Sequence, residues 1–314
     1  MDSVSVIMCT FNNGRFIEEA IRSLLRQTQL PEEIIVIDDG STDGTEEIVR
    51  SLHEPRIRYL YQSNRGPSAA RNRGILLSTG DYVAFLDADD RWRETMVEKQ
   101  LAVMHSDPSL VCCFTNFVRF ENDTGAVLAD AFSYLPLDSL KTCPGPIPNT
   151  SIVDDDPFCG LIRFGIIPAF TQVLMCRRSA INGMSFNETL RVCEDTEFVL
   201  RLFLKGNVAY NTEVLADIRR HDSNTTKDYS MTAVAELAAF RILEPAVPAG
   251  ARRRAFADRF VKTHVDAACA YINRGHAKSG VATYFRAFKT EGSYLRKTKG
   301  AVRMAMTAWD RLRS

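Results

Sequence analysis

The stretch GDYVAFLDADD, residues 80–90, joins a short apolar run to three closely spaced carboxylates. The run from residue 82 to 86 is apolar on both faces, which is typical of a strand buried in the middle of a parallel sheet. Asp87, Asp89 and Asp90 follow it directly. Carboxylates held this close repel one another and lose hydration unless a cation or a ligand offsets their charge. The stretch therefore predicts a buried strand that ends at a binding site.

Short apolar runs alternate with helical periodicities around this stretch, as they do in a series of βαβ units. We predict strands at residues 4–9, 34–37, 57–61 and 82–86, and a later one near 215–218. We predict helices at residues 17–25, 46–52, 67–77 and 97–104. This order predicts an α/β fold class, with a mostly parallel sheet flanked by helices and a helical extension at the C-terminal end.

Polar clusters follow three of the predicted strands. TFNN (residues 10–13) follows the first, DDGS (38–41) the second and DADD (87–90) the fourth. The carboxyl ends of parallel strands meet at one edge of a sheet, where ligands bind. Asp, Asn, Gly and Ser also serve as turn and capping residues, which is the alternative for any single cluster. Two acidic clusters at one edge favour a site.

The acidic residues suit a particular kind of ion. An Asp-x-Asp at a strand end offers oxygen ligands to Mg²⁺ or Mn²⁺, ions that keep several waters and share their coordination with a ligand's phosphates. His and Cys do not occur at the spacing of zinc ligands. We therefore expect Mg²⁺ or Mn²⁺ as the cofactor.

The composition is that of a soluble globular protein. The chain has 314 residues, a formal net charge of +0 and 25% charged residues, so nothing in it indicates a nucleic-acid partner. Its eight cysteines form no CxxC pair and are expected to be reduced thiols of a cytoplasmic protein. We expect no signal peptide and no membrane span, because the first residues lack a basic n-region and no apolar run approaches ~18 residues.

Four ordered motifs in the first 90 residues resemble those of the family 2 glycosyltransferases: VSVIMCTFNN, IIVIDDGSTDGT, NRGPSAARNRGI and GDYVAFLDADD. RVCEDTEFVLRL (residues 191–202) extends the resemblance to about residue 222. It implies the GT-A fold, the Rossmann-like fold of nucleotide-diphospho-sugar transferases, and inverting transfer from a nucleotide-sugar donor, with a UDP-sugar expected. The Gln-x-x-Arg-Trp motif of processive members is absent, so we expect one sugar per encounter.

The resemblance also implies a division of the chain. Residues 1–225 would form the GT-A domain, with a nucleotide-binding half at 1–105 and an acceptor-binding half at 106–225. Residues 226–314 would form a helical C-terminal region.

The first two clusters then supply contacts to the nucleotide. Thr10 and Phe11 would flank the base and ribose, with Asn12 beside them. Asp39 would accept the uracil N3 hydrogen, a contact that an ionised carboxylate can make. Asp38, its neighbour, would be structural or lie close to the ribose.

The remaining donor contacts fall on the later motifs. Arg71 would reach the base or the diphosphate, where its fixed charge complements the nucleotide. Asp87 would contact the ribose or a metal-bound water, Asp89 would ligate the metal, and Asp90 would orient the loop or the sugar. His221, in RRHDSNTT, is a third metal candidate, although a lone histidine is more often structural. The predicted donor-binding set is Thr10, Phe11, Asn12, Asp38, Asp39, Arg71, Asp87, Ala88 and Asp89.

The catalytic base is expected in CEDTEF. The acceptor hydroxyl must lose its proton as it attacks, which requires a positioned carboxylate. Asp195 matches the second residue of the family's Glu-Asp pair and is the predicted base, with Glu194 as the alternative. On local pattern alone, both residues could simply be the acidic first turn of a helix.

Two later segments lie outside the motifs, and their roles are less closely defined by the sequence. Residues 141–168 are irregular and rich in Pro, Gly and Asp, so we expect a loop that borders the acceptor pocket, with 154–156 as a solvated part of it. From residue 274 to the end, ten Lys and Arg stand against two acidic residues. Residues 281–314 would lie on an anionic membrane as an amphipathic helix, or form a helical cap or a homodimer contact.

The expected acceptor is a hydroxyl of a glycan or lipid-linked precursor, and the expected location is the cytoplasm, peripheral to the inner face of the plasma membrane. The alternative hypothesis is a catalytically inactive GT-A-like protein that binds nucleotide or glycan. The intact Asp39, Asp89 and Asp195 favour the enzyme.

Overall fold

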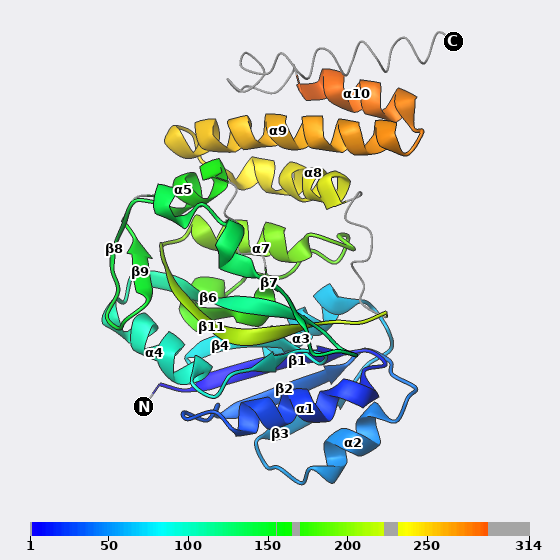
Figure 1. The fold of residues 1–314 in the computed structure, drawn as a ribbon, viewed down its shortest axis with the longest axis vertical. Helices are drawn as coiled ribbons and strands as arrows, with labels where there is room; N and C mark the ends of the chain where they lie inside the picture. Colours follow the sequence, from blue (N-terminus) through cyan, green and yellow to red (C-terminus); the bar gives the residue numbers. More distant parts are fainter. Residues whose placement is uncertain (1, 155, 165–169, 223–231, 288–314) are drawn as a thin grey trace.

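The structure is a computed structural model that describes residues 2–154, 156–164, 170–222 and 232–287. One sheet runs through the α/β part in the order β3-β2-β1-β4-β10-β6-β11-β9-β8, with β5 paired to β11 and β7 to β6 (Figure 1). The strands of its first half are β1 (Val4–Thr10), β2 (Glu33–Asp38), β3 (Ile57–Tyr61) and β4 (Tyr82–Asp87). All of their mutual pairings are parallel. The predicted strands are therefore present at the predicted places.

The second half of the sheet is mixed, because β10 pairs antiparallel with both β4 and β6, whereas β6 and β11 are parallel. Its strands are β5 (Arg91–Trp92), β6 (Leu110–Glu121), β7 (Val127–Asp130), β8 (Thr142–Pro144), β9 (Thr150–Val153), β10 (Leu174–Arg177) and β11 (Asn207–Arg220). The α/β fold class is confirmed, and the parallel pairing is confined to the first half and to the β6–β11 pair.

Helices flank this sheet. They are α1 (Gly14–Leu25), α2 (Thr45–Ser51), α3 (Pro67–Leu77), α4 (Met96–Ser106), α5 (Pro157–Phe164), α6 (Arg178–Ile181) and α7 (Glu194–Phe203). Short 3₁₀ turns lie at Ala131–Tyr134, Leu137–Ser139, Thr171–Val173 and Glu244–Ala246. A Cβ atom at Gly74 of α3 would meet the Ile7 side chain at 2.3 Å, so α3 packs on β1 more closely than any other residue there would allow.

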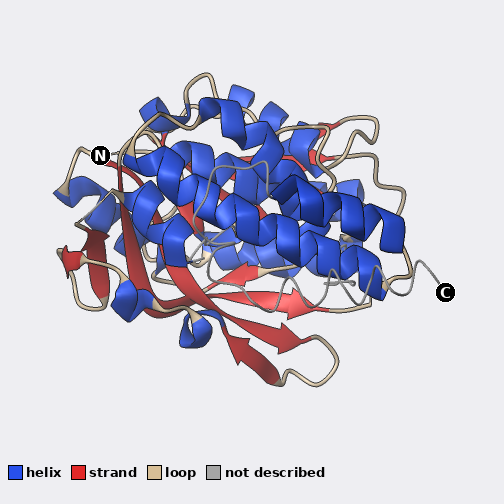
Figure 2. Cartoon of the chain, turned by 90° about the horizontal axis from the view of Figure 1, so that it is seen from above, coloured by secondary structure: helices blue, strands red, loops and turns tan. Residues whose placement is uncertain are grey.

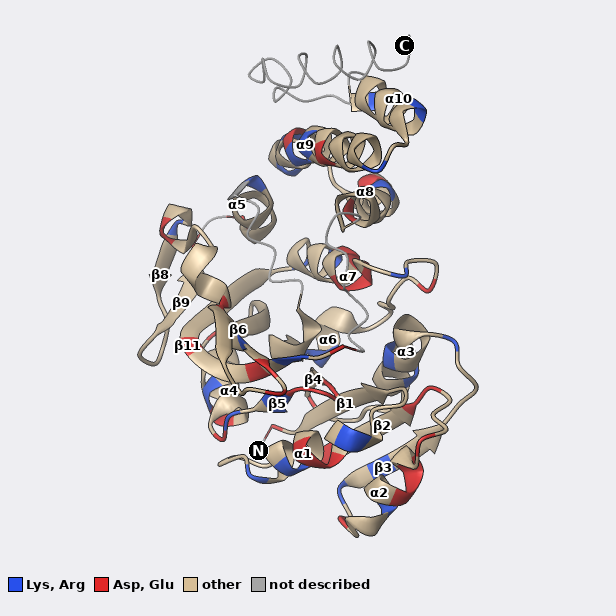
Figure 3. Cartoon of the chain, turned by 45° about the vertical axis from the view of Figure 1, so that its right-hand side comes forward, with Lys and Arg blue, Asp and Glu red and all other residues tan. Residues whose placement is uncertain are grey.

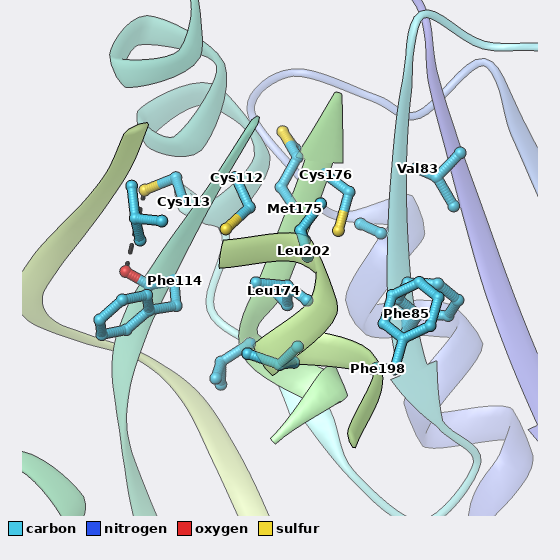
Figure 4. Packing of buried hydrophobic residues seen from close by; sticks show 14 of the residues in the cluster. Val83, Phe85, Cys112, Cys113, Phe114, Leu174, Met175, Cys176, Phe198 and Leu202 are labelled. Atoms are coloured by element: carbon cyan, nitrogen blue, oxygen red, sulfur yellow. Dashed lines mark hydrogen bonds between the residues drawn. The ribbon is translucent and has the colours of Figure 1, made fainter. Parts of the chain in front are cut away.

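The core lies where the two halves of the sheet meet. Figure 4 shows Phe85 of β4 beside Phe198 of α7, and Cys112, Cys113 and Cys176 on the neighbouring strands β6 and β10. All eight cysteines are free, and burial raises the pKa of the Cys113 thiol to about 12. The thiols therefore act here as small apolar side chains.

The prediction of a loop at residues 141–168 is wrong. The segment holds β8, β9 and α5, because the stretch at 150–153, three of whose four residues are β-branched, pairs with β11, and the apolar residues of 157–164 have helical spacing. Residues 155 and 165–169 lie outside the described ranges. Asp156, predicted to be solvated, accepts the Cys159 amide at 3.0 Å and pairs with Arg252 of a later helix, so it ties two helices together.

The C-terminal region contains α8 (Thr232–Leu243), α9 (Ala251–Asn273) and α10 (Ala277–Ala287). Figure 1 shows them stacked beyond α7, at the opposite end of the molecule from α2, and Figure 2 looks down on them. Phe240 and Phe256 belong to the same buried cluster as the sheet residues. The boundary at residue 225 stays a prediction, and the described helices beyond it share the core of the α/β part.

The predicted membrane-facing segment, 281–314, is described only as far as residue 287. None of the helices within the described ranges combines the length and the apolar character needed to cross a bilayer.

Candidate active site

Strands β1, β2 and β4 end at the same edge of the sheet. In their register Thr10 lies opposite Asp38, and Cys9 lies opposite Asp87. The three polar clusters that follow these strands are therefore neighbours, and Figure 3 shows acidic stretches of the ribbon beside β1 and β4. This edge is the candidate active site.

Asp39 is buried and anchors the segment that leads into α3. One of its carboxylate oxygens accepts from the Gln62 side chain at 2.7 Å and the Arg65 amide at 2.9 Å. The other accepts the Gly66 amide at 2.7 Å. A carboxylate offers about four acceptor positions, so this geometry leaves about one for a ligand. Asp39 thus holds the loop and retains the capacity to accept a further donor.

The hydrogen bonds of Asp38 hold the turn that follows β2. Its two oxygens accept the Ser41 amide at 2.7 Å and the Tyr59 hydroxyl at 2.6 Å, and the residue is fully buried. These contacts close the turn after β2 and tie it to β3. Of the two roles expected for Asp38, its geometry supports the structural one.

The first cluster combines an exposed aromatic ring, a residue that joins two loops and a buried hydroxyl. The Phe11 side chain is 49% exposed at the sheet edge and offers a flat apolar surface. The side-chain oxygen of Asn12 accepts the Thr42 amide at 2.8 Å, and the backbone amide of Asn12 donates to the Ser41 hydroxyl at 2.9 Å. Asn12 therefore joins the loops after β1 and β2. The Thr10 hydroxyl is buried without a hydrogen-bond partner among the described residues.

Asp87, Asp89 and Asp90 present carboxylate oxygens that all lie within 4.8 Å of one another. Burial, and then the charge of Asp87, raises the pKa of Asp89 above its ordinary range, against the opposing effect of His221. Burial and its two acidic neighbours raise the pKa of Asp90 well above that range. A cation would relieve this repulsion, and the oxygen-rich donor set fits Mg²⁺ or Mn²⁺.

His221 lies at this cluster, 132 residues away from it in sequence. Its Nε2 atom is 2.9 Å from Asp89 Oδ2, and its side chain is only 4% exposed. The ring packs on Phe16 with centroids 4.7 Å apart. The structure thus brings together the three residues predicted to hold a metal, Asp87, Asp89 and His221. Ala88, between the two aspartates, is fully buried and can offer a ligand only its backbone.

Arg219, which no sequence motif indicated, supports this loop together with Asp90. Asp90 accepts the Arg219 amide at 2.7 Å, and Arg219 Nε donates to the Asp89 carbonyl at 2.8 Å. The guanidinium lies 4.8 Å from the rings of both Phe16 and Phe120. Strand alternation could have found it, because residues 219 and 221 share one side of an extended segment whereas residue 220 faces the other.

Gln172 is a second missed neighbour. Its side-chain amide donates to Asp87, and its carbonyl accepts the Trp92 indole N–H at 2.7 Å. A single glutamine in a 3₁₀ turn carries no sequence signal, since only the fold brings it to the end of β4.

Arg71 links the donor-side carboxylates to α7. Its side chain is 8% exposed, with Nη1 at 2.8 Å from Glu194 Oε1 and Nη2 at 3.2 Å from Asp87 Oδ1. Burial alone would lower the pKa of this guanidinium, but Asp87 and Glu194 outweigh burial and raise it. The arginine is permanently charged and held between two acids.

Asp195 occupies the first turn of α7, after Cys193, whose φ of 64° is left-handed. Within the described residues its carboxylate accepts one hydrogen bond, from the Thr196 amide at 2.7 Å. Burial, and then the charge of Glu194, raises the pKa of Asp195 to about 7, although Arg71 opposes the shift. Glu194 is paired with Arg71, so the two adjacent acids have different surroundings.

Comparison with known proteins bears on this arrangement. The family model "Glycosyl transferase family 2" matches residues 5–168. The chain is 33% identical over 220 residues to the putative teichuronic acid biosynthesis glycosyltransferase TuaG of Bacillus subtilis, a match that covers 69% of this chain and 78% of TuaG. It is 44% identical over 144 residues to the uncharacterized glycosyltransferase YibD of Escherichia coli, which covers 45% of this chain and 40% of YibD.

The fold resembles that of TarS from S. aureus. The crystal structure of TarS 1–349 superposes with a TM-score of 0.65 at 17% identity, over 91% of this chain and 80% of that one. The same fragment in complex with UDP-GlcNAc gives a TM-score of 0.64 at 18% identity, over 90% and 81% of the two chains. The predicted GT-A fold is confirmed by this likeness. With the family match over more than half of its length, the chain belongs to glycosyl transferase family 2 and is a glycosyltransferase.

Proposed function

We propose that the chain transfers one sugar from a UDP-sugar to a hydroxyl of a glycan precursor, with inversion at the anomeric carbon and with the help of a divalent ion. The observation that carries the proposal is the link between two acidic sites. Arg71 pairs with Asp87, which clusters with Asp89 after β4, and with Glu194, the neighbour of Asp195 at the start of α7. One site suits a leaving diphosphate, and the other suits an attacking hydroxyl.

The donor base would lie against Phe11, whose exposed ring offers a stacking surface. Asp39 would accept the N3 hydrogen of uracil with its remaining acceptor position. The unpartnered Thr10 hydroxyl would contact the ribose or base. UDP-GlcNAc and UDP complexes of the structurally similar TarS support a uridine nucleotide.

Asp89, with Asp87 and His221, would hold the metal ion. A divalent ion held by these residues would supply positive charge to offset the charge of the leaving diphosphate. Arg219 and Asp90 keep the Asp89 backbone in place through the two hydrogen bonds described above. Asp90 would thus serve the loop geometry rather than the ion.

Asp195 would remove the proton from the acceptor hydroxyl as that oxygen attacks the face opposite the diphosphate. A base with a pKa of about 7 is well matched to this task, since it is partly ionised at neutral pH and still accepts a proton readily. Glu194 is less suited because Arg71 holds it in an ion pair. The name of the relative TuaG supports a surface-glycan precursor as the acceptor, lipid-linked or free.

The test is calorimetric titration of UDP with and without Mn²⁺, followed by a donor-hydrolysis screen across nucleotide sugars. We expect Mn²⁺-dependent UDP binding and slow hydrolysis of one UDP-sugar. Asp89→Ala should weaken UDP binding at least tenfold in Mn²⁺ and change little in EDTA. Asp138→Ala, an exposed aspartate of a 3₁₀ turn, is the control.

Two outcomes would overturn parts of this proposal. Absence of binding by any nucleotide would remove the donor assignment. Binding without turnover for any donor or acceptor would favour the alternative function, a catalytically inactive nucleotide-binding protein.

A further inference from the structure

The two terminal nitrogens of Arg71 are each paired with an acid. It lies in α3, buried, and both of its terminal nitrogens are engaged: Nη1 with Glu194 at 2.8 Å and Nη2 with Asp87 at 3.2 Å. A guanidinium presents its donors in a fixed planar fork, so these two contacts also set its orientation. The side chain is therefore a fixed bridge between two acids from separate elements.

The surroundings of the bridge are rigid. The Phe186 ring lies 5.5 Å from the Arg71 guanidinium carbon and stacks on Phe198 of α7 at 4.1 Å. Asn72, the next residue of α3, accepts the Phe186 amide at 2.6 Å and donates to its carbonyl at 3.0 Å. These contacts fix the segment before α7 against α3, and the bridge lies beside them.

The bridge bears directly on the first turn of α7. Glu194 is the first residue of that helix, and Asp195 follows it, so a contact that holds the Glu194 side chain also restricts the turn that presents Asp195. Without the arginine, the carboxylates of Asp87, Glu194 and Asp195 would repel one another across a partly buried space. Repulsion would act on the first turn of α7, which carries two of these three carboxylates.

We propose that Arg71 is a positioning residue: through Glu194 it places Asp195 for attack, and it does not bind the nucleotide. This inference rests on the proposed function of Asp195. It replaces the donor contact that the sequence predicted for Arg71 with a contact to the base's neighbour.

The experiment is a double-mutant cycle of Arg71→Lys and Glu194→Ala. Lysine keeps the charge but cannot bridge two carboxylates with a planar fork. We expect each single variant to lower kcat by about 10- to 100-fold, the usual effect of a misplaced catalytic group. The Kd for UDP in Mn²⁺ should stay within about threefold of wild type. The double variant should be no slower than the slower single one, because both changes break the same contact.

Arg201→Lys is the matched control. Arg201 also pairs with a glutamate in α7, Glu197, through two nitrogens at 2.6 and 2.8 Å, and it lies outside the proposed site. Its replacement should reproduce any general loss of α7 stability while leaving kcat within about twofold of wild type. The circular dichroism melting curves of all variants separate unfolding from misplacement.

The opposite pattern would overturn the proposal. An Arg71→Lys enzyme with tenfold weaker UDP binding and normal kcat would make Arg71 a nucleotide ligand, and strictly multiplicative effects in the double variant would remove the path through Glu194. If Arg71→Lys does not fold, the Glu194→Ala variant tests the proposal by itself. A wild-type kcat in Glu194→Ala would contradict the positioning role of Arg71. A wild-type protein that neither binds UDP nor turns over a donor would instead overturn the proposed function itself.

Discussion

At the scale of single residues, the site gives the predicted base, Asp195, and its neighbour Glu194 different surroundings. Glu194 forms an ion pair with Arg71, whereas Asp195 accepts only an amide among the described residues. Burial next to Glu194 raises the pKa of Asp195 to about 7 because it disfavours the ionised form. The difference comes from α3, which lies more than a hundred residues earlier in the chain.

Asp195→Asn should leave donor binding nearly intact and abolish transfer. The amide keeps the shape of the side chain but cannot take a proton, so kcat should fall at least 10²-fold while the Kd for UDP in Mn²⁺ stays within about threefold. Calorimetry and single-turnover transfer measure the two quantities. An equal loss of affinity and rate would place Asp195 in the donor site.

The pH dependence of transfer should report the same group. A base must be ionised to act, so a pKa of about 7 predicts that kcat/KM is low at pH 5.5, rises tenfold per pH unit on its acid limb and levels above about pH 7.5. UDP binding measured over the same range separates this limb from titration of the acidic cluster. An acid limb near pH 4 would contradict the assignment.

At the scale of elements, the end of β11 and the loop after β4 support each other. Arg219 donates to the Asp89 carbonyl, and its guanidinium also pairs with Glu19 of α1, which pairs in turn with Arg91 of β5. Three elements far apart in sequence therefore hold one loop. Such outer contacts determine how well ligands converge on a metal.

Glu19→Gln should weaken metal binding without unfolding the protein. The change removes the charge that holds Arg219, so we expect about tenfold weaker Mn²⁺ binding in the presence of UDP, measured by calorimetry or by the electron paramagnetic resonance of free Mn²⁺. Glu18→Gln is the control, because Glu18 lies on the same helix and, within the described part of the chain, its ion pair is a local one with Arg22. Equal effects of the two changes would argue against the support.

At the scale of the whole molecule, the C-terminal helices are continuous with the α/β part. Phe256 of α9 is fully buried and stacks on Phe240 of α8 at 5.3 Å, and α8 in turn packs against α7. Arg252 of α9 also pairs with Asp156 and donates to the Leu204 carbonyl. The helix that carries Asp195 is thus covered by the region that the family motifs do not reach.

Phe256→Ala should destabilise the molecule as one unit. Loss of this buried ring should cost about 3–5 kcal/mol of unfolding free energy. In a Trp309→Phe background the fluorescence of Trp92 reports on the α/β part alone, and its urea midpoint should fall together with the circular dichroism midpoint. Phe285→Ala, at a ring that is 55% exposed, should change both little. An unchanged Trp92 transition would show that the helices unfold separately.

The sequence by itself determined the fold class and the identity of most site residues. Its periodicities located β1 to β4 and α1 to α4, because short buried strands and amphipathic helices carry their pattern in neighbouring residues. The polar clusters after β1, β2 and β4 had to meet, since parallel strands end at one edge. The segment at 141–168 was predicted wrongly because its turn residues masked two short strands. Of these, β9 pairs with β11, which lies beyond residue 200, and β8 pairs with β9.

Only the tertiary structure decided what each site residue touches. It paired Arg71 with Glu194, set His221 against Asp89, and placed Arg219 and Gln172 where no motif indicated them. The physical reason is that burial and electrostatic coupling depend on distance in space, and residues of α3, α7 and β11 come close only when the sheet has formed. The sequence identified the acidic residues of the site. The tertiary packing determined that Glu194 is paired with Arg71 and that the pKa of Asp195 is raised.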